Sequence, residues 1–410
     1  MHKSANIRQF SLLFLALASV SALASWKIFD MTMVALGILF LTAPLQHARL
    51  FTSSLKPFNY AVLSWLVIVF LGYVFTTPLG SDQWTDLLSF RWILGFYFCV
   101  CAAHYISISE DRFQKFSILA IITLSLGLLW QFYAYNFLPL TKESDTRFMG
   151  FFHNTNHYSL TISLLWAFTL GWISSDMREG IRPAKVVLFL FAFLCFCLIG
   201  SLGRSAWVGC SITALFMLYF YRDSKLIRRL TVVSFAAMAF MFLFNIGSVK
   251  NRIMYSFSLT DESATGVRLI LWRTNWEIFL DHPLFGVGFY ENIRLLPEYY
   301  AKLGFSGLHY YAHAHNQYLE LLSGSGLFGL FGYLTIFGLA LRFYYRHYRK
   351  NEQFINRKMA FAMMLVLLTF LFESLTESPF NLREPRNLLI LLGGCTYAWL
   401  SRPAKSAKLD

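Results

Sequence analysis

The sequence has 410 residues, of which 57% are hydrophobic and only 14% are charged. Soluble domains carry about 25% charged residues, so this composition argues against a water-soluble protein and predicts a membrane protein. The formal net charge of +13 does not by itself indicate nucleic-acid binding, because membrane proteins keep an excess of Lys and Arg in their cytoplasmic loops. No basic patch interleaved with aromatic residues occurs in a soluble segment, so we expect no nucleic-acid partner.

Apolar runs of about 20 residues, the length that crosses a bilayer as a helix, follow one another along most of the chain. We predict an all-α, polytopic membrane protein with about twelve transmembrane helices and one long helical extracytoplasmic loop. The expected spans are residues 8–25, 29–46, 58–76, 87–106, 115–138, 157–175, 185–202, 205–222, 228–247, 316–341, 358–376 and 387–401. The first also resembles a secretory signal peptide, but further apolar segments follow it, so we expect a retained helix.

The Lys and Arg residues of the connections predict how the helices are oriented. They gather on one side, most densely at 342–358, whereas the opposite connection at 76–86 carries none. This asymmetry predicts that both termini are cytoplasmic. The resulting division is nine spans in 1–247, a periplasmic loop in 248–315, and three spans with a cytoplasmic tail in 316–410.

The long loop contains a segment with helical periodicity, Val267–Leu280. Its apolar residues recur at three- and four-residue spacing, which predicts an amphipathic helix lying on, or over, the membrane surface. The apolar positions are Leu269, Trp272, Trp276, Phe279 and Leu280. Arg268 and Arg273 belong to the same helix. One or both could face inward to a ligand, or both could form its solvated polar face.

An arginine also lies in the tight turn Gly203-Arg204-Ser205, between two apolar segments. Its planar guanidinium suits a phosphate or pyrophosphate ligand. The alternative is an arginine that extends from a helix end to the membrane surface and binds nothing. The spacing alone does not separate these two interpretations.

Two histidines, His313 and His315, precede an apolar helix that begins near Asn316. A neutral histidine there could accept a proton from a sugar hydroxyl. The pattern His-x-His could also bind a metal ion, but the sequence shows no third ligand, such as paired Asp or Glu, nearby. A third interpretation is that both histidines are packing residues at the membrane interface.

Two further polar groups lie at helix ends on the same predicted side. The segment from Arg147 to His157 is rich in amide and imidazole groups, which suit sugar hydroxyls. The same groups suit capping of the next helix by Asn154, Thr155 or Asn156. Around the last periplasmic turn both signs of charge occur together, which predicts a structural ion-pair cluster. Its members are Glu373, Glu377, Arg383, Glu384 and Arg386.

The position of these groups favours an enzyme over a transporter of lipid-linked glycans. A transporter would carry polar or broken helices near the midplane, commonly in repeated halves. Here the middles of the apolar runs are nearly free of charge, and the candidate residues gather at one face. A purely structural membrane scaffold would leave those residues without a role.

The order of these motifs resembles the O-antigen ligase family, within the wider group of ligases, O-antigen polymerases and bacterial O-oligosaccharyltransferases. The resemblance covers most of the chain. It is most specific at Gly203–Ser205, at Arg268–Gly288 and at His315-Asn316 with the glycines 326 and 329 that follow. The segment Gly150–Asn156 is a weaker match.

The resemblance implies an inverting, metal-independent transfer of a glycan from undecaprenyl pyrophosphate, without a cofactor. It implies that His315 is the general base for the acceptor hydroxyl, with His313 as a rival, and that Arg204 and Arg268 bind the pyrophosphate. The supporting candidates are His313, Asn316, Arg273, Arg147 and Asn156.

For a ligase, the family implies an O-antigen donor and a lipid A–core acceptor, joined at the periplasmic face of the bacterial inner membrane in lipopolysaccharide biosynthesis. An O-antigen polymerase or O-oligosaccharyltransferase could use the same residues with a different acceptor. The O-oligosaccharyltransferases typically append a soluble C-terminal region, so the length of this chain favours a ligase over them.

Overall fold

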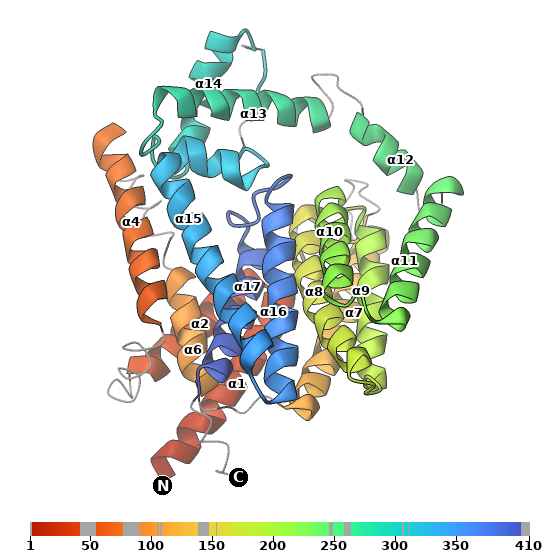
Figure 1. Cartoon of the computed structure of the whole chain (residues 1–410). Coiled ribbons are helices and arrows are strands. Elements are labelled where there is room, and N and C mark those ends of the chain that lie inside the picture. Colours follow the sequence, from red (N-terminus) through yellow and green to blue (C-terminus); the bar gives the residue numbers. More distant parts are fainter. Residues whose placement is uncertain are drawn as a thin grey trace.

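The computed structural model of the protein describes residues 2–41, 55–76, 90, 92–104, 106, 109–137, 147–152, 154–245, 249–257, 264–305, 307–310 and 312–402. Within these ranges every regular element is a helix, which confirms the expected all-α class (Figure 1). Most of the connection at 76–86, for which we predicted a periplasmic position, lies outside the described residues.

The helices form a bundle with a smaller layer above it (Figure 1). The first part of the bundle comprises α1 (His2–Ala24), α2 (Trp26–Leu41), α4 (Lys56–Thr76), α6 (Trp92–His104), α7 (Glu110–Phe137), α8 (Thr155–Arg178), α9 (Lys185–Ser201), α10 (Arg204–Phe220) and α11 (Lys225–Leu243). Its last helices are α15 (Gln317–Lys350), α16 (Phe354–Glu373) and α17 (Arg383–Leu400). The upper layer comprises α12 (Val249–Met254), the short helix η3 (Tyr255–Phe257), α13 (Ala264–Asp281) and α14 (Glu291–Leu303).

Five helices of the described chain are long and apolar enough to cross a membrane. These segments are Ile7–Ala24, Lys56–Phe75, Glu110–Asn136, Gln317–Lys350 and Phe354–Glu373. Three more, α6, α9 and α10, are apolar but shorter. The expected number of twelve spans is therefore not confirmed, although most of the predicted spans do contain a helix.

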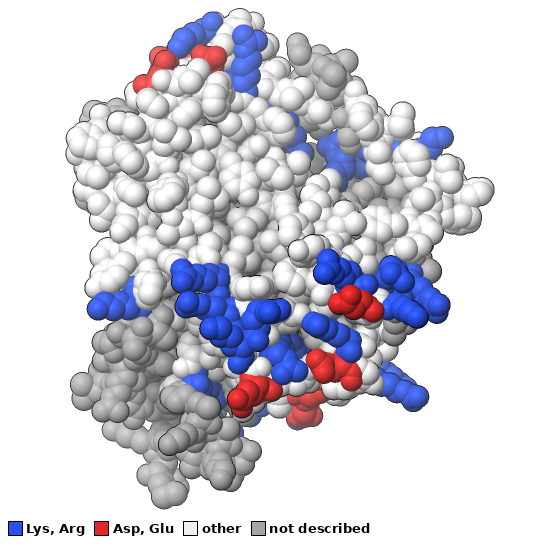
Figure 2. Space-filling view, viewed as in Figure 1, with Lys and Arg blue, Asp and Glu red and all other residues white. Residues whose placement is uncertain are grey.

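Large apolar side chains cover the outside of the bundle. Phe132 on α7, Tyr219 on α10 and Phe331 on α15 are 66%, 68% and 72% exposed. In Figure 2 a broad uncharged band lies above a lower edge that carries most of the visible Lys and Arg. An apolar surface of this extent suits contact with lipid rather than water. The fold is that of an integral membrane protein.

Helix α16 is the central column of the bundle. It packs against α8, α10 and α15, and buried side chains run along it from Lys358 to Glu373. Gly171 of α8 permits the close approach of the two backbones, since a Cβ atom there would lie 2.5 Å from the Cα of Ala362. Small residues serve the same purpose between other membrane helices. This packing determines where the chain emerges at the upper end of α16.

Helix α15 is interrupted near its upper end. Gly326 has φ of 65°, so the segment before it runs in a different direction from the long lower part. The loop after α13 binds to this interruption: the N–H of Val287 donates to the carbonyl of Ser323 at 3.0 Å, and that of Gly288 to Gly324 at 2.9 Å. These bonds attach the upper layer to the start of α15.

A buried polar network makes a second attachment between the layers. Asn275 of α13 accepts hydrogen bonds from Asn292 of α14 at 2.9 Å and from the hydroxyl of Ser323 at 2.7 Å. Buried polar groups that hydrogen-bond to one another across helices favour one arrangement of those helices. The network therefore sets the position of α13 above α15.

The helix predicted at 267–280 is present as α13, but its predicted apolar stripe is only partly correct. Leu269, Trp276 and Leu280 are 45%, 44% and 51% exposed. The face that is buried against α14 carries Leu271 and Ile278. The helical spacing of the apolar residues was compatible with more than one apolar face. Contact with α14 decided which face is buried, and the sequence pattern of α13 holds no information on that contact.

Candidate active site

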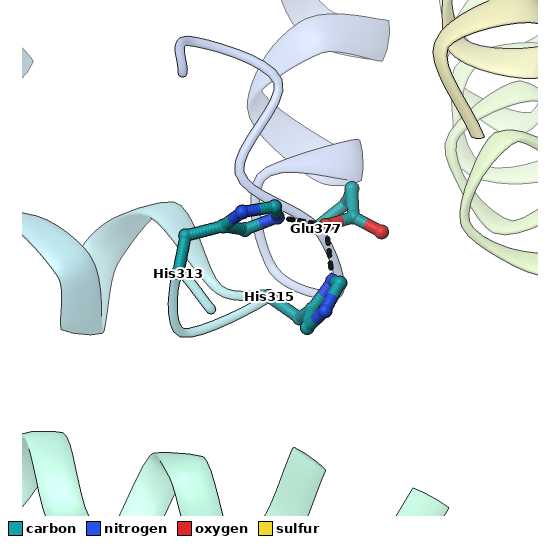
Figure 3. Close-up of side chains that lie close together, drawn as sticks. All are labelled: His313, His315 and Glu377. Atoms are coloured by element: carbon teal, nitrogen blue, oxygen red, sulfur yellow. Dashed lines mark hydrogen bonds and ion pairs between the residues drawn. The ribbon is translucent and has the colours of Figure 1, made fainter. Parts of the chain in front are cut away.

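The carboxylate of Glu377 lies at the centre of a cluster of polar side chains. Its Oε1 atom is 2.5 Å from Nδ1 of His315 and 3.0 Å from Nε2 of His313. Its Oε2 atom accepts hydrogen bonds from Arg268 at 3.2 Å and from the amide of Asn156 at 3.1 Å. Figure 3 shows the two imidazole rings meeting the carboxylate from the segment that precedes α15. The cluster thus joins α8, α13, the start of α15 and the chain after α16.

The charge of this cluster follows from its hydrogen bonds. Burial acts to raise the pKa of Glu377, but the bonds from His313 and His315 hold that pKa well below its usual value. Burial acts to lower the pKa of His313, but the bond to Glu377 raises it above its usual value. The carboxylate is therefore ionised and acts only as an acceptor, which orients both imidazoles and Arg268.

The local backbone explains why His315 is held in this position. His315 itself has φ of 49°, a left-handed conformation that few residues other than glycine adopt. The next residue, Asn316, is the N-cap of α15, and its side chain accepts from the N–H groups of Tyr318 and Leu319. Its amide also donates to the carbonyl of Leu375 at 3.1 Å. The supporting role expected of Asn316 is therefore that of a cap that positions its neighbour.

The two histidines differ in which ring nitrogen remains outside the carboxylate contact. His315 uses Nδ1 for Glu377, and its Nε2 lies 3.2 Å from the hydroxyl of Tyr310. His313 uses Nε2 for the same carboxylate. An imidazole held by a carboxylate on one nitrogen can accept a proton on the other. The Tyr310 hydroxyl therefore shows that a hydroxyl group can lie within hydrogen-bond distance of Nε2 of His315.

Several arginines converge beside this cluster. Arg204 begins α10, and its pKa is lowered to about 10 by burial and by the positive charges of Arg252, Arg268 and Arg147. Arg252 of α12 donates to the carbonyl of Leu202, in the turn just before Arg204. Like charges that approach one another at a partly buried place favour an anionic ligand. The sequence predicted three of these arginines, whereas it gave no indication of Arg252.

Of the other supporting candidates, Arg273 lies away from the cluster and Asn156 belongs to it. Arg273 is exposed and lies over the ring of Phe305, 5.9 Å from its centroid, rather than beside Glu377. The alternative of a solvated polar face therefore holds for Arg273. Asn154 is the N-cap of α8 and accepts from the N–H of Asn156 at 2.7 Å. The cap uses only the backbone N–H of Asn156, so its side-chain amide can donate to Glu377.

The residues expected to form one ion-pair cluster at the last turn have separate partners. Glu384 lies 2.5 Å from Nδ1 of His157, Arg383 stacks on Trp26 at 4.0 Å from the ring centroid, and Glu377 belongs to the histidine cluster. Sequence reasoning missed the role of Glu377 because its partners are distant along the chain. The pair of histidines spaced by one residue was the local signal that could have prompted a search for a carboxylate partner elsewhere in the chain.

His313, His315 and Glu377 could together hold a metal ion. The ligand atoms of His313, His315 and Glu377 all lie within 4.8 Å of one another. The expectation that no third ligand lies near the two histidines is therefore wrong, because folding brings Glu377 to them. A divalent cation would have to replace the direct contacts of Glu377 and lie beside the positive charge of Arg268, which disfavours it.

The fold and the site together define a class: a helical membrane protein in which a histidine–carboxylate cluster lies beside converging arginines. Residues 189–334 match the family model described as O-Antigen ligase, which confirms the resemblance noted from the motifs over this part of the chain. The match includes Arg204, Arg268 and His315 and ends before Glu377.

The chain is also similar to the teichuronic acid biosynthesis protein TuaE of Bacillus subtilis (strain 168). The two are 23% identical over 235 residues, which cover 55% of this chain and 47% of TuaE. The matched region thus spans about half the length of this curated relative. Together the two likenesses support a membrane enzyme of polysaccharide biosynthesis within the wider group that includes ligases and polymerases.

Proposed function

We propose that the protein is an O-antigen ligase, which transfers an undecaprenyl-pyrophosphate-linked O-antigen glycan to a lipid A–core sugar in lipopolysaccharide biosynthesis. The observation that carries this proposal is the arrangement of His315 on Glu377, in one cluster with Arg268 and close to Arg204. It combines a proton acceptor with a site for an anionic leaving group, which are the two elements that glycosyl transfer from a pyrophosphate needs.

In the proposed reaction, Nε2 of His315 accepts the proton of the acceptor hydroxyl as its oxygen attacks the anomeric carbon of the donor glycan. The bond from that carbon to the pyrophosphate oxygen breaks, and the electron pair leaves with the pyrophosphate. A single displacement of this kind inverts the anomeric configuration. Glu377 stabilises the imidazolium that forms, as the carboxylate does in other histidine–carboxylate pairs.

Arg204 and Arg268 would stabilise the negative charge that develops on the pyrophosphate. Arginine suits this task because its planar guanidinium forms paired hydrogen bonds with phosphate oxygens. Arg147 and Arg252 add positive charge nearby, and this charge contributes to the lowered pKa of Arg204. We therefore propose a reaction that requires neither a metal ion nor a cofactor.

We further propose that the histidine cluster faces the periplasm of a bacterial cell and that both termini are cytoplasmic. The distribution of charge supports this orientation: Lys and Arg residues crowd the lower edge of the molecule (Figure 2), whereas α13 and the start of α15, beside the cluster, lie at the upper end (Figure 1). The division into residues 1–247, 248–315 and 316–410 belongs to the same proposal, as do membrane lipids as the surroundings.

A second candidate function is an O-antigen polymerase or O-oligosaccharyltransferase with the same type of donor. The name of TuaE, which refers to the biosynthesis of teichuronic acid, favours keeping this candidate, because it places a relative in the synthesis of a different polysaccharide. The chemistry at His315 would be the same, and only the acceptor hydroxyl would differ.

Complementation of a strain that lacks its O-antigen ligase tests the proposal. Expression of this protein should restore a ladder of O-antigen on lipid A–core, resolved on a gel. The matched control is the His315→Ala variant at equal protein level. Bare core with accumulated lipid-linked polymer would refute the ligase, and restored polymer length in a strain lacking its polymerase would assign the second candidate.

A further inference from the structure

A cavity lies at the opposite end of the bundle from the histidine cluster. It has a volume of about 350 Å³ and lies between the lower ends of α8, α10 and α15 and the start of α16. Its charged lining side chains are Arg178, Arg349, Lys350, Arg357, Lys358 and Glu179. Positive charge thus predominates in a concave site to which the proposed transfer reaction assigns no role.

Arg178 is held in a definite position in this cavity. Its Nη1 atom donates to the hydroxyl of Tyr348 at 2.5 Å, and its guanidinium lies over the ring of Tyr221, 4.9 Å from the centroid. Tyr221 is in turn 3.1 Å from the hydroxyl of Ser175. Both tyrosines are neutral partners, so they orient the guanidinium without cancelling its charge.

The floor of the cavity is neutralised within the protein. Lys358 is 1% exposed and donates to both carboxylate oxygens of Asp176 at 2.6 Å. A further bond joins Lys358 to Glu110 at 2.9 Å. Arg357 pairs with Glu179 at 3.5 Å. Of the described residues that line the cavity, Arg178, Arg349 and Lys350 lie exposed at its mouth and form no ion pair with a carboxylate, so the net charge of the cavity is positive.

The positive charge at the mouth comes from Arg178, Arg349 and Lys350, which lie in the last turns of α8 and α15. Cations in these positions also interact favourably with helix dipoles. If these cations served only to interact with the helix dipoles and water, neither a fixed guanidinium at Arg178 nor a cavity would be needed. In addition, α16 begins at the cavity with Phe354, and its cap residue Gln353 makes no side-chain cap hydrogen bond.

We propose that this cavity binds a phosphoryl group, that of an anionic phospholipid headgroup or of free phosphate. The paired N–H donors of Arg178, together with a second cation, match phosphate oxygens. Basic pockets between membrane helices on the cytoplasmic side bind anionic headgroups in this way.

The lipid is the source that the surroundings favour. The cavity is lined by the lower ends of the helices (Figure 1), and the charged lower edge of the molecule borders the uncharged band (Figure 2). Two exposed tyrosines lie close by in the sequence: Tyr219 before Tyr221, and Tyr345 one helical turn before Tyr348, with exposures of 68% and 45%. Exposed aromatic residues of this kind are typical of the boundary between headgroups and acyl chains.

The test uses the full chain, purified in a neutral detergent, and follows its thermal midpoint. Added phosphatidylglycerol should raise the midpoint by about 3 °C or more, because a ligand that binds only the folded state stabilises it. Phosphatidylcholine, which is zwitterionic, should produce less than half of that shift. In the double variant R178Q/R349Q, the phosphatidylglycerol shift should fall to the phosphatidylcholine level.

The matched control is R182Q/R222Q, which removes two exposed arginines of the same region that do not line the cavity. It should keep the native shift. An equal loss in this control, or an undiminished shift in R178Q/R349Q, would overturn the proposal. If R178Q/R349Q does not fold, R349Q alone is used, with bound lipid counted by native mass spectrometry.

A third arm distinguishes the two sources of the phosphoryl group. Inorganic phosphate, without lipid, should leave the midpoint nearly unchanged if the headgroup is the ligand. A shift with phosphate that matches the lipid shift and is lost in R178Q/R349Q would retain the phosphoryl site and assign it to free phosphate. No shift with either probe would overturn the proposal.

Discussion

At the scale of single residues, the buried carboxylate of Glu377 organises the candidate site. It is 1% exposed and contacts two histidines, an arginine and an asparagine. A buried carboxylate is tolerated only when its charge is paired and its lone pairs are satisfied. Here Oε2 has two partners and Oε1 has three, the third being the N–H of Ser378 at 3.2 Å, so the same contacts that stabilise the charge also orient the proposed base.

The first prediction concerns the identity of the base. Replacing His315→Ala should reduce glycan transfer by about 10²-fold or more, because a general base typically contributes 10²–10⁴-fold to the rate. His313→Ala should have a smaller effect, since the proposed proton acceptor is Nε2 of His315, which lies 3.2 Å from the hydroxyl of Tyr310, and His313 shares only the contact with Glu377. Transfer is measured with purified donor and acceptor at equal protein level. Normal transfer by His315→Ala would move the role of base to His313.

The second prediction concerns pH. Because the folded-state pKa of His313 is raised, its stabilising contribution is complete below about pH 6.5 and is lost as pH rises through the raised pKa. The lowered pKa of Glu377 gives a contribution that is present above about pH 4.5 and is lost as pH falls through the lowered value. The native thermal midpoint should therefore be highest between these two limits.

Glu377→Gln tests whether the charge of Glu377 causes this pH dependence, because the variant keeps the shape of the side chain and removes its charge. The fall in thermal midpoint on the alkaline side should shrink in this variant. Glu179→Gln, at the far end of the bundle, should keep the native dependence. An unchanged alkaline fall in Glu377→Gln would show that the carboxylate does not control the protonation of His313.

The third prediction concerns metal. Because Arg204 and Arg268 supply the positive charge in the proposed reaction, transfer should persist when a strong chelator is present. The measurement is the initial rate of glycan transfer before and after dialysis against the chelator. A loss of activity that added metal restores would instead assign His313, His315 and Glu377 as metal ligands.

At the scale of elements, the interruption of α15 connects the two layers. Gly324 and Gly326 both lie against the backbone of the loop that follows α13. Gly326 has a further role, because its left-handed backbone turns the chain toward the segment that carries the histidines. The position of His315 above the bundle thus depends on a backbone conformation that glycine adopts at little cost.

The fourth prediction follows from that conformation. Gly326→Ala should destabilise the protein by about 2 kcal/mol or more and reduce transfer, because φ is 65° and the new Cβ would lie 2.3 Å from Leu284. Gly338→Ala, in the same helix and with nothing within 4 Å of its Cβ position, should be close to neutral. Thermal unfolding of both variants is the measurement, and equal midpoints would contradict the proposed role of Gly326.

At the scale of the whole molecule, the two ends of the bundle differ in chemistry. One end carries the histidine cluster under a layer of short helices, and the other carries a dense band of Lys and Arg (Figures 1 and 2). The difference agrees with the orientation that we propose, in which the basic end is cytoplasmic.

The fifth prediction tests this orientation in cells. Alkaline phosphatase, which is active only after export, should be active when fused after Gly304, between α14 and α15. A cytoplasmic fluorescent reporter should be active when fused after Asn351, between α15 and α16. The opposite pair of results would reverse the orientation and place the histidine cluster in the cytoplasm.

The sequence alone predicted much of the candidate site. Local patterns indicated Arg204, Arg268 with Arg273, and His313 with His315, and the family resemblance selected Arg204, Arg268 and His315 among them. The structure places these three near one another. Glu377 and Arg252 were not predicted as site residues. Their partners come from other helices, as in the contact between Asn156 and Glu377, and no local spacing encodes such a contact.

The sequence by itself determined the helical class and the membrane setting, because long apolar runs and the scarcity of charge are local properties of the chain. Only the tertiary structure decided which face of α13 is buried, that Glu377 binds the histidines, and that a basic cavity forms at the far end. The physical reason is the same in each case. These features depend on contacts between helices, and close packing and the pairing of buried charge select among arrangements that the sequence pattern leaves equally open.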